Sequence, residues 1–214
     1  MKKIFNPNLP VWNSDSPIWY CDADGVCLDW LTPFIKFCES KGHIALHDQP
    51  ENFSMVDIFP TLKQPWKLIE EYQQSEFYAQ IKAYDDAKQA FAEAKEAGVD
   101  IIIVTSCGKD DYVVQCRKKT VEQEFNGVVS DIRFLDYGAS KLKELKKYRS
   151  GVFMDDQEVI ALEGRDAGHH SLLRSRSYNR SAKPEGVIRV DDMTQVSRGF
   201  KQRKLNERAL ENSY

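Results

Sequence analysis

The stretch Ile18–Val26 reads IWYCDADGV, an apolar run that ends in two carboxylates one residue apart, followed by glycine. A short apolar run closed by a turn signal is typical of a buried strand in a parallel sheet. In open α/β sheets, ligands bind beyond the carboxyl ends of such strands. Because side chains two residues apart in a strand point the same way, Asp22 and Asp24 can converge on one small volume. The stretch therefore predicts a functional site at a strand end.

Two later apolar runs end in a similar way. Residues 99–104 (VDIIIV) lead into Thr105-Ser106-Cys107-Gly108, and residues 151–154 (GVFM) lead into Asp155-Asp156. Helix-like patterns separate the three runs. Three strands that each stop in hydroxyls or carboxylates predict a doubly wound α/β sheet with its chemistry at one edge.

The order of these motifs resembles that of the haloacid dehalogenase (HAD) superfamily of phosphohydrolases. The motif residues would be, in chain order, Asp22 and Asp24, Thr105, Lys141, and Asp155 and Asp156. The resemblance implies a Rossmann-like three-layer α/β/α core with a doubly wound parallel sheet. Details such as Thr105-Ser106 and Tyr178-Asn179 are similar to the 5'(3')-deoxyribonucleotidase branch, whereas Gln157 and Glu158 depart from the pattern of that branch.

Phosphate-ester hydrolysis explains what these residues would do. An aspartate nucleophile divides a slow reaction into two displacements through an aspartyl-phosphate, and Asp22 is the expected nucleophile. A hard cation such as Mg²⁺ offsets the repulsion between anions, with Asp22 and Asp155 as the expected side-chain ligands. The resemblance adds the backbone carbonyl of Asp24 as a ligand and places Asp156 beside the metal site. The Asp24 side chain then stays free to act as general acid and afterwards as general base.

Three further residues are expected to bind the phosphoryl group. Thr105 and Ser106 offer hydroxyls, and backbone N–H groups near Ser106 and Gly108 can add to an anion cradle. Ser140 is a favourable helix N-cap, which places Lys141 in the first turn near the sheet edge. Lys141 is therefore preferred as the phosphate-binding cation. Its alternatives are Lys143 and Lys146, although a solvated helix face also accounts for these lysines.

The segment 31–84 is far longer than a simple strand-to-helix connection, so it must hold structure of its own. Helices are expected at 31–40 and 66–78, forming a small helical cap inserted after the first strand. HAD relatives with an insertion here use it to select the leaving group. Trp30 and Phe53 are accordingly the candidate specificity residues, as aromatic side chains that can stack on a nucleobase.

The sequence predicts a domain organisation in three parts. Residues 1–30 and 85–196 form the HAD-like core, with a helix at 85–97 and a last strand at 171–173, and residues 31–84 form the cap. Residues 197–214 are charged and form a surface helix or a tail.

Composition supports a globular protein. The chain has 214 residues, 42% of them hydrophobic and 29% charged, with a net charge of −3, which argues against a protein built to hold nucleic acid stably. No apolar run is long enough for a membrane span, and Met1-Lys2-Lys3 does not lead into a signal core, so the expected location is the cytoplasm. Five cysteines without paired spacing are expected to be reduced. The sequence allows a homodimer.

The sequence thus predicts a Mg²⁺-dependent phosphomonoesterase that acts on a small phosphate ester. The favoured substrate is a (deoxy)nucleoside monophosphate, which would make the protein a 5'-nucleotidase. A sugar-phosphate phosphatase or a phosphatase of nucleic-acid 3' ends would use the same motifs. An alternative of another class is a catalytically silent nucleotide-binding or regulatory protein on the same scaffold.

Overall fold

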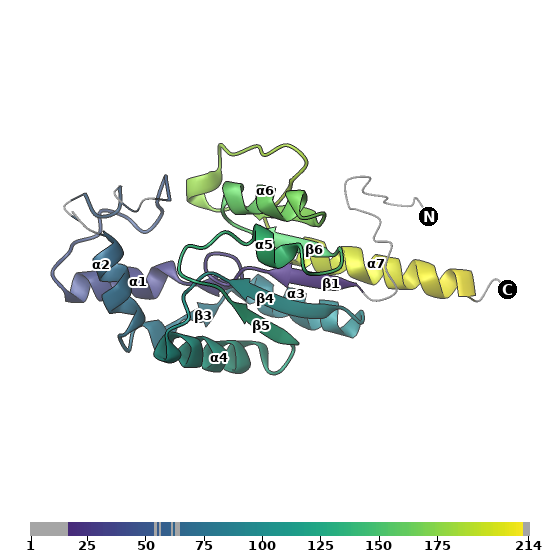
Figure 1. Ribbon diagram of the computed structural model, residues 1–214, viewed down its shortest axis with the longest axis horizontal. Coiled ribbons are helices and arrows are strands. Elements are labelled where there is room, and N and C mark those ends of the chain that lie inside the picture. The colour runs from purple at the N-terminus through teal and green to yellow at the C-terminus, as the bar shows by residue number, and fades with distance from the viewer. Residues whose placement is uncertain (1–16, 54, 56, 61, 63–64, 212–214) are drawn as a thin grey trace.

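The apolar run before Asp22 forms β1 (Ile18–Cys21), an inner strand of a six-stranded sheet in the computed structural model (Figure 1). The structure describes residues 17–211 apart from 54, 56, 61 and 63–64. The predicted core residues 1–16 and tail residues 212–214 lie outside this described part. The other strands are β4 (Asp100–Thr105), β5 (Asp131–Phe134), β6 (Val152–Asp155), β7 (His170–Arg174) and β8 (Ile188–Val190).

All neighbouring strands of this sheet pair in parallel, in the order β5-β4-β1-β6-β7-β8. The chain builds the sheet outward from β1 in one direction through β4 and in the other through β6. The strand order therefore reverses beside β1, and such a switch point opens a crevice at the carboxyl ends of the strands. Asp22 and Asp155 lie at this crevice because they follow β1 and end β6.

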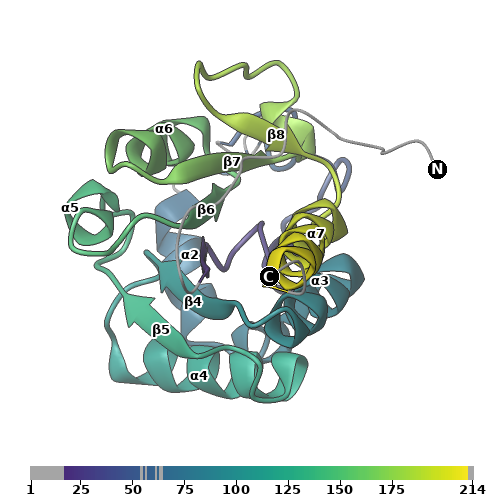
Figure 2. The same cartoon turned by 90° about the vertical axis from the view of Figure 1, so that its right-hand side faces the viewer.

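Helices cover both faces of the sheet, as Figure 2 shows. Trp19 and Cys21 point into a core shared with α3 (Asp85–Glu96), α4 (Asp111–Phe125) and α7 (Thr194–Glu211). Ile18 and Tyr20 point to the opposite face, toward α5 (Leu142–Leu145) and α6 (Glu158–Asp166). Alternate side chains of β1 thus pack into the cores on the two faces of the sheet, and the predicted three-layer α/β/α fold is confirmed.

The inserted segment carries α1 (Leu31–Ser40), α2 (Pro65–Gln73) and the 3₁₀ turn η1 (Tyr78–Gln80). Its two ends are joined by a small antiparallel ladder of β2 (Leu28–Asp29) and β3 (Lys82–Ala83). Buried aromatic rings fill its interior, with Phe34 and Tyr72 in edge-on contact at 5.3 Å. In Figure 1, α1 and α2 lie beyond one end of the sheet, on the opposite side from the free end of α7. The limits of the cap as a domain remain a prediction.

Two expected elements differ from those observed. The helix expected at 66–78 ends at Gln73 because the chain turns there: the Ser75 hydroxyl donates to the carbonyl of Tyr72, and Ser is prone to such local bonds. The expectation that 171–173 is the last strand is wrong, because β8 adds a further edge strand. β8 has only three residues, too few for a clear alternating pattern.

The C-terminal segment is a helix that begins at Thr194, before the expected start at residue 197. Phe200 is buried and lies 5.9 Å from the ring of Trp19, so the first part of α7 is core rather than tail. Among the described residues, no helix is long and apolar enough to cross a membrane.

Candidate active site

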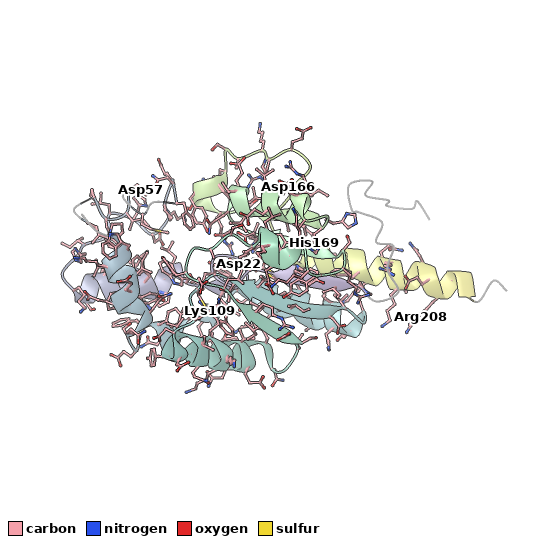
Figure 3. The ribbon with its side chains drawn as sticks, viewed as in Figure 1. Asp22, Asp57, Lys109, Asp166, His169 and Arg208 are labelled. Atoms are coloured by element: carbon pink, nitrogen blue, oxygen red, sulfur yellow. The ribbon has the colours of Figure 1, made fainter. Side chains whose placement is uncertain are left out.

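Strand register brings the acidic residues of the first and last motifs together. Cys21 in β1 pairs with Met154 in β6, so the residues that follow them, Asp22 and Asp155, emerge side by side. Oxygen atoms of Asp22, Asp155 and Asp156 all lie within 4.8 Å of one another, and all three residues are buried. Figure 3 shows Asp22 near the end of the sheet that faces the inserted segment. We refer to these three residues as the acidic cluster.

Lys141 supplies the positive charge of this cluster. Its ammonium lies 2.5 Å from Asp22 Oδ1 and 2.8 Å from Asp155 Oδ2, and the residue is only 3% exposed. The two carboxylates raise the pKa of Lys141 against the opposing effect of burial. Lys143 and Lys146 are exposed, so Lys141 is the one of the three candidate lysines that the fold places in the cluster.

The local structure around Lys141 differs from the expected N-cap. Helix α5 begins at Leu142, and Lys141 occupies the N-cap position, where its side chain makes no capping bond. The backbone N–H groups of Lys141 and Leu142 donate instead to the Glu163 carboxylate of α6, with a further bond from Leu142 to Ser140 Oγ. A carboxylate from another helix therefore caps α5 and fixes the backbone that carries Lys141.

Asp155 and Asp156 carry strongly perturbed carboxyl groups. Burial raises the pKa of Asp155 to about 6, with Lys141 opposing this rise and Asp22 adding to it. The pKa of Asp156 is raised further by burial and by the neighbouring acids. Three carboxylates beside a single ammonium leave an excess of buried negative charge, which favours a proton or a cation in this place.

The donor set of the acidic cluster fits Mg²⁺. All its donors are oxygens, which hard cations prefer, and Asp156 Oδ1 is buried without a hydrogen-bond partner among the described residues. Such an orphaned oxygen is costly unless a ligand satisfies it. Asp22, Asp155 and Asp156 are therefore the residues that could hold the metal. The role of the Asp24 backbone carbonyl remains a prediction.

Tyr178 and Asn179, in the 3₁₀ turn η2 (Ser177–Asn179) after β7, hold Asp156 in place. The Tyr178 hydroxyl donates to Asp156 Oδ2, and Asn179 Nδ2 donates to the Asp156 carbonyl at 2.7 Å. The sequence drew attention to this Tyr-Asn pair but offered no contact for it, because the bonds span more than twenty residues. Tyr178 thus fixes the side chain of Asp156, and Asn179 fixes its backbone.

The Asp24 side chain is held by Arg117, a contact that the sequence did not predict. Arg117 Nη2 on α4 lies 2.5 Å from Asp24 Oδ1 and 2.7 Å from Oδ2. Asp24 lines the same cavity as Asp22. Burial raises the pKa of Asp24. The positive charge of Arg117 opposes this rise, and the negative charge of Asp22 adds to it. A carboxyl with a raised pKa is suited to donating a proton, so the geometry is compatible with the expected acid–base role.

The second motif surrounds the site from β4. Thr105 is buried at the strand end and lines the cavity, as does Ser106. The Ser106 hydroxyl donates to the Ala139 carbonyl at 2.9 Å, which holds the loop that leads to Lys141. The Gly108 N–H is bonded to the Leu135 carbonyl, so it cannot join the anion cradle expected for it. Phosphate binding by Thr105, Ser106 and Lys141 remains a prediction.

A cavity of about 960 Å³ lies between these motifs and the inserted segment. Both candidate specificity residues line it. Trp30 is stacked against Phe34 of the cap at 4.5 Å, whereas Phe53 is 53% exposed and meets the ring of Tyr178 edge-on at 5.7 Å.

Two exposed aromatic residues, Trp66 and Tyr137, also line the cavity and were not chosen as specificity residues from the sequence. Trp66 is 52% exposed and shares the inner face of α2 with Ile69 and Gln73, and Tyr137 is 57% exposed on the loop after β5. Trp66, Ile69 and Gln73 are spaced as residues on one helix face, so the sequence pattern of α2 could have predicted that they face the same side. No sequence pattern pointed to Tyr137, because it lies in a loop.

The fold is similar to that of solved hydrolases of the HAD superfamily. A haloacid dehalogenase-like hydrolase from Streptococcus pneumoniae aligns with 86% of this chain and 98% of its own, with a TM-score of 0.58 and 14% identity. A mutant of CbbY from Rhodobacter sphaeroides, in complex with xylulose-1,5-bisphosphate, aligns with 84% of this chain and 96% of its own, with a TM-score of 0.54 and 14% identity. At these identities the similarity establishes the fold.

A similar sequence occurs in Enterobacteria phage T4. The uncharacterized 32.4 kDa protein of the Gp30-rIII intergenic region is 28% identical in a match of 150 residues that covers 65% of this chain. The match spans 54% of the phage protein, about half of its length. No protein-family model matches the chain.

Proposed function

We propose that this protein is a Mg²⁺-dependent phosphomonoesterase that works through an aspartyl-phosphate on Asp22. The observation that carries the proposal is the buried arrangement of Asp22 and Asp155 around the Lys141 ammonium, beside the unsatisfied oxygen of Asp156. Three buried acids and one base would add little to stability alone, because removing these charges from water costs more free energy than their mutual attraction provides. The HAD fold of the solved hydrolases supports the same conclusion.

The reaction follows from the placement of two carboxyls. An oxygen of Asp22 attacks phosphorus while the bond to the leaving oxygen breaks, and Asp24 gives that oxygen a proton. Water then attacks the aspartyl-phosphate, Asp24 takes a proton from it, and the bond to Asp22 breaks to release phosphate. Lys141 and the Thr105 hydroxyl would meet the negative charge of the transferring group.

Mg²⁺, when bound by Asp22, Asp155 and Asp156, would supply the neutralising charge that lets an anionic nucleophile approach an anionic phosphate. The protein's own contribution is to fix these carboxylates in advance. Lys141 joins Asp22 to Asp155, and Tyr178 and Asn179 fix Asp156.

The cavity supports a nucleoside monophosphate as the substrate. Phe53, Trp66 and Tyr137 come from separate segments, are each more than half exposed, and all line the same cavity. Exposed aromatic faces around a phosphate site are suited to stacking on a nucleobase. A nucleotidase of this kind would place the phosphate at Asp22 and the base against this rim.

A sugar phosphate is the second candidate substrate. It is favoured by the Rhodobacter sphaeroides structure, which carries xylulose-1,5-bisphosphate on the same fold. Asp48 and Gln49 also line the cavity and could accept hydrogen bonds from sugar hydroxyls.

Phosphate release from a panel of substrates tests the proposal. The panel holds ribo- and deoxyribonucleoside 5'- and 3'-monophosphates, sugar phosphates and a 3'-phosphorylated oligonucleotide, each assayed with Mg²⁺ and with EDTA. Mg²⁺-dependent release confined to nucleotides is the expected result. Release from sugar phosphates alone would favour the second candidate, and no release from any substrate would favour a silent binding protein.

Variants of two acids that line the cavity separate the chemistry from general damage. Asp22→Asn is expected to abolish turnover with the fold retained. Asp29→Asn is the matched control, since Asp29 lines the cavity outside the acidic cluster, and it should keep turnover within a few fold. Undiminished turnover by Asp22→Asn would refute the nucleophile assignment.

A further inference from the structure

Among the described residues near the candidate site, Arg117 is the most completely buried basic one. It lies on α4, is 1% exposed and does not line the cavity. Its Nη2 contacts both oxygens of Asp24 and donates to the Tyr78 hydroxyl at 2.8 Å. Its Nε and Nη1 atoms have no hydrogen-bond partner among the described residues.

This arrangement is poorly explained by stability. A buried guanidinium loses its hydration, and here two of its three nitrogens recover no hydrogen bond from the part of the chain that the structure describes. Well-packed apolar residues in place of a buried ion pair are often as stable or more so. Asp24, the one acid that Arg117 contacts among the described residues, is also the carboxyl that faces the reacting phosphate in the proposed mechanism.

We propose that Arg117 is a positioning residue that holds the Asp24 carboxyl toward the leaving group, a conclusion that rests on the proposed function. Arg117 Nη2 contacts both oxygens of Asp24, and Asp24 lines the cavity whereas Arg117 does not, so the guanidinium holds the carboxyl from the protein side. Tyr78, at the base of the inserted segment, contacts the guanidinium both through its hydroxyl and through its ring at 5.2 Å. The Asp24 side chain is thereby prevented from rotating away from the point of proton transfer.

The chemistry of the leaving group distinguishes this role from a structural one. In the first displacement, the Asp22–phosphorus bond forms as the bond to the leaving oxygen breaks. A nucleoside alkoxide needs the Asp24 proton at that moment, whereas p-nitrophenolate leaves without one. Misplacing Asp24 should therefore slow the first displacement for a nucleotide much more than for p-nitrophenyl phosphate.

The test is single-turnover release of each leaving group by the wild type and by Arg117→Met, with saturating Mg²⁺. Arg117→Met is expected to slow nucleoside release about 100-fold and p-nitrophenolate release less than about fivefold. KM should change little, because Arg117 does not line the cavity. Equal losses on the two substrates, or no loss on either, would overturn the positioning role.

Arg174→Met is the matched control. Arg174 is 4% exposed on β7 and its Nη2 lies 2.5 Å from Asp86 Oδ2, so it is a buried pair of the same kind that does not contact Asp24. Arg174→Met should slow the release of both leaving groups alike.

If circular dichroism shows that Arg117→Met does not fold, Arg117→Lys takes its place. Its side chain is shorter, so we expect the same selective loss, judged by the same criterion. A wild type inactive on both substrates would overturn the proposed function and this inference together.

Discussion

The Lys141 ammonium lies 2.5 Å from Asp22 Oδ1 and joins it to Asp155, 2.8 Å away on the other side. One side chain from the loop after β5 thus holds together the ends of β1 and β6. All three groups are buried, so the contact is little weakened by solvent, and the loss of the cation leaves two carboxylates facing one another.

Lys141→Met is therefore expected to affect both activity and stability. Phosphate release should fall about 100-fold or more, as is usual when a fixed electrostatic partner of the transition state is removed. The free energy of unfolding should fall by about 3–5 kcal/mol, the usual result of breaking a buried pair. Initial rates and urea unfolding measure the two effects. Lys143→Met is the matched control, since exposed Lys143 should cost less than about 0.5 kcal/mol.

Magnesium is expected to stabilise the protein against heat. At ten times its Kd, a ligand of the folded state adds about 1.4 kcal/mol, or a rise of about 3–6 °C in Tm for a chain of this size. The rise should shrink below about pH 6, because the pKa of Asp155 is raised to about 6 and protons then compete with the metal. Thermal melts with and without Mg²⁺ at pH 5.5 and 8 measure this.

Asp155→Asn should reduce the magnesium shift, whereas Asp29→Asn should leave it unchanged. Asp29 is a fair control because it lines the same cavity outside the acidic cluster. An equal shift in both variants would place the metal elsewhere.

The parts of the site that could be predicted from sequence are those set by strand periodicity. Asp22 and Asp155 directly follow or end apolar runs, and parallel strands bring their carboxyl ends to one edge whatever the register. Lys141 could be placed because a turn and a helix start preceded it, although the cap itself comes from Glu163 on another helix.

The partners of those residues could not be predicted in the same way. Arg117 sits in the run CRKKT, which has the composition of a solvated helix face, and its burial depends on Asp24, 93 residues earlier. The bond of Tyr178 to Asp156 likewise depends on tertiary packing. Pairings between distant elements carry no local periodicity, so a sequence pattern offers no signal for them.

Protonation of His169 is expected to destabilise the fold. Its Nδ1 accepts from the Gly151 N–H and its Nε2 contacts the Leu145 carbonyl, and burial lowers its pKa. The unfolded chain therefore binds more protons than the folded one as pH falls through 6.5, so stability is present above that pH and is lost below it. Urea unfolding from pH 5 to 8 should show this loss.

His169→Gln isolates this effect from other titrating groups, including the nearby His170, whose pKa burial also lowers. The unfolding free energy of the variant should depend less steeply on pH between 5 and 7 than that of the wild type. Parallel profiles would mean that His169 makes no contribution to the acid sensitivity.

Gly25 is expected to tolerate no side chain, for two separable reasons. Its φ of +76° is strained for other residues, and a Cβ there would lie 2.7 Å from the Tyr178 hydroxyl and closer still to Asp156 Oδ2. Gly25→Ala should therefore disturb the acidic cluster as well as the backbone.

Gly42→Ala is the matched control, since Gly42 has a φ of +87° but open space around its Cβ position. Gly42→Ala should cost about 1 kcal/mol, the cost of backbone strain alone, with phosphate release retained. Gly25→Ala should cost clearly more and also weaken the magnesium shift in thermal melts; equal costs with an unchanged shift would show that Gly25 serves the turn only.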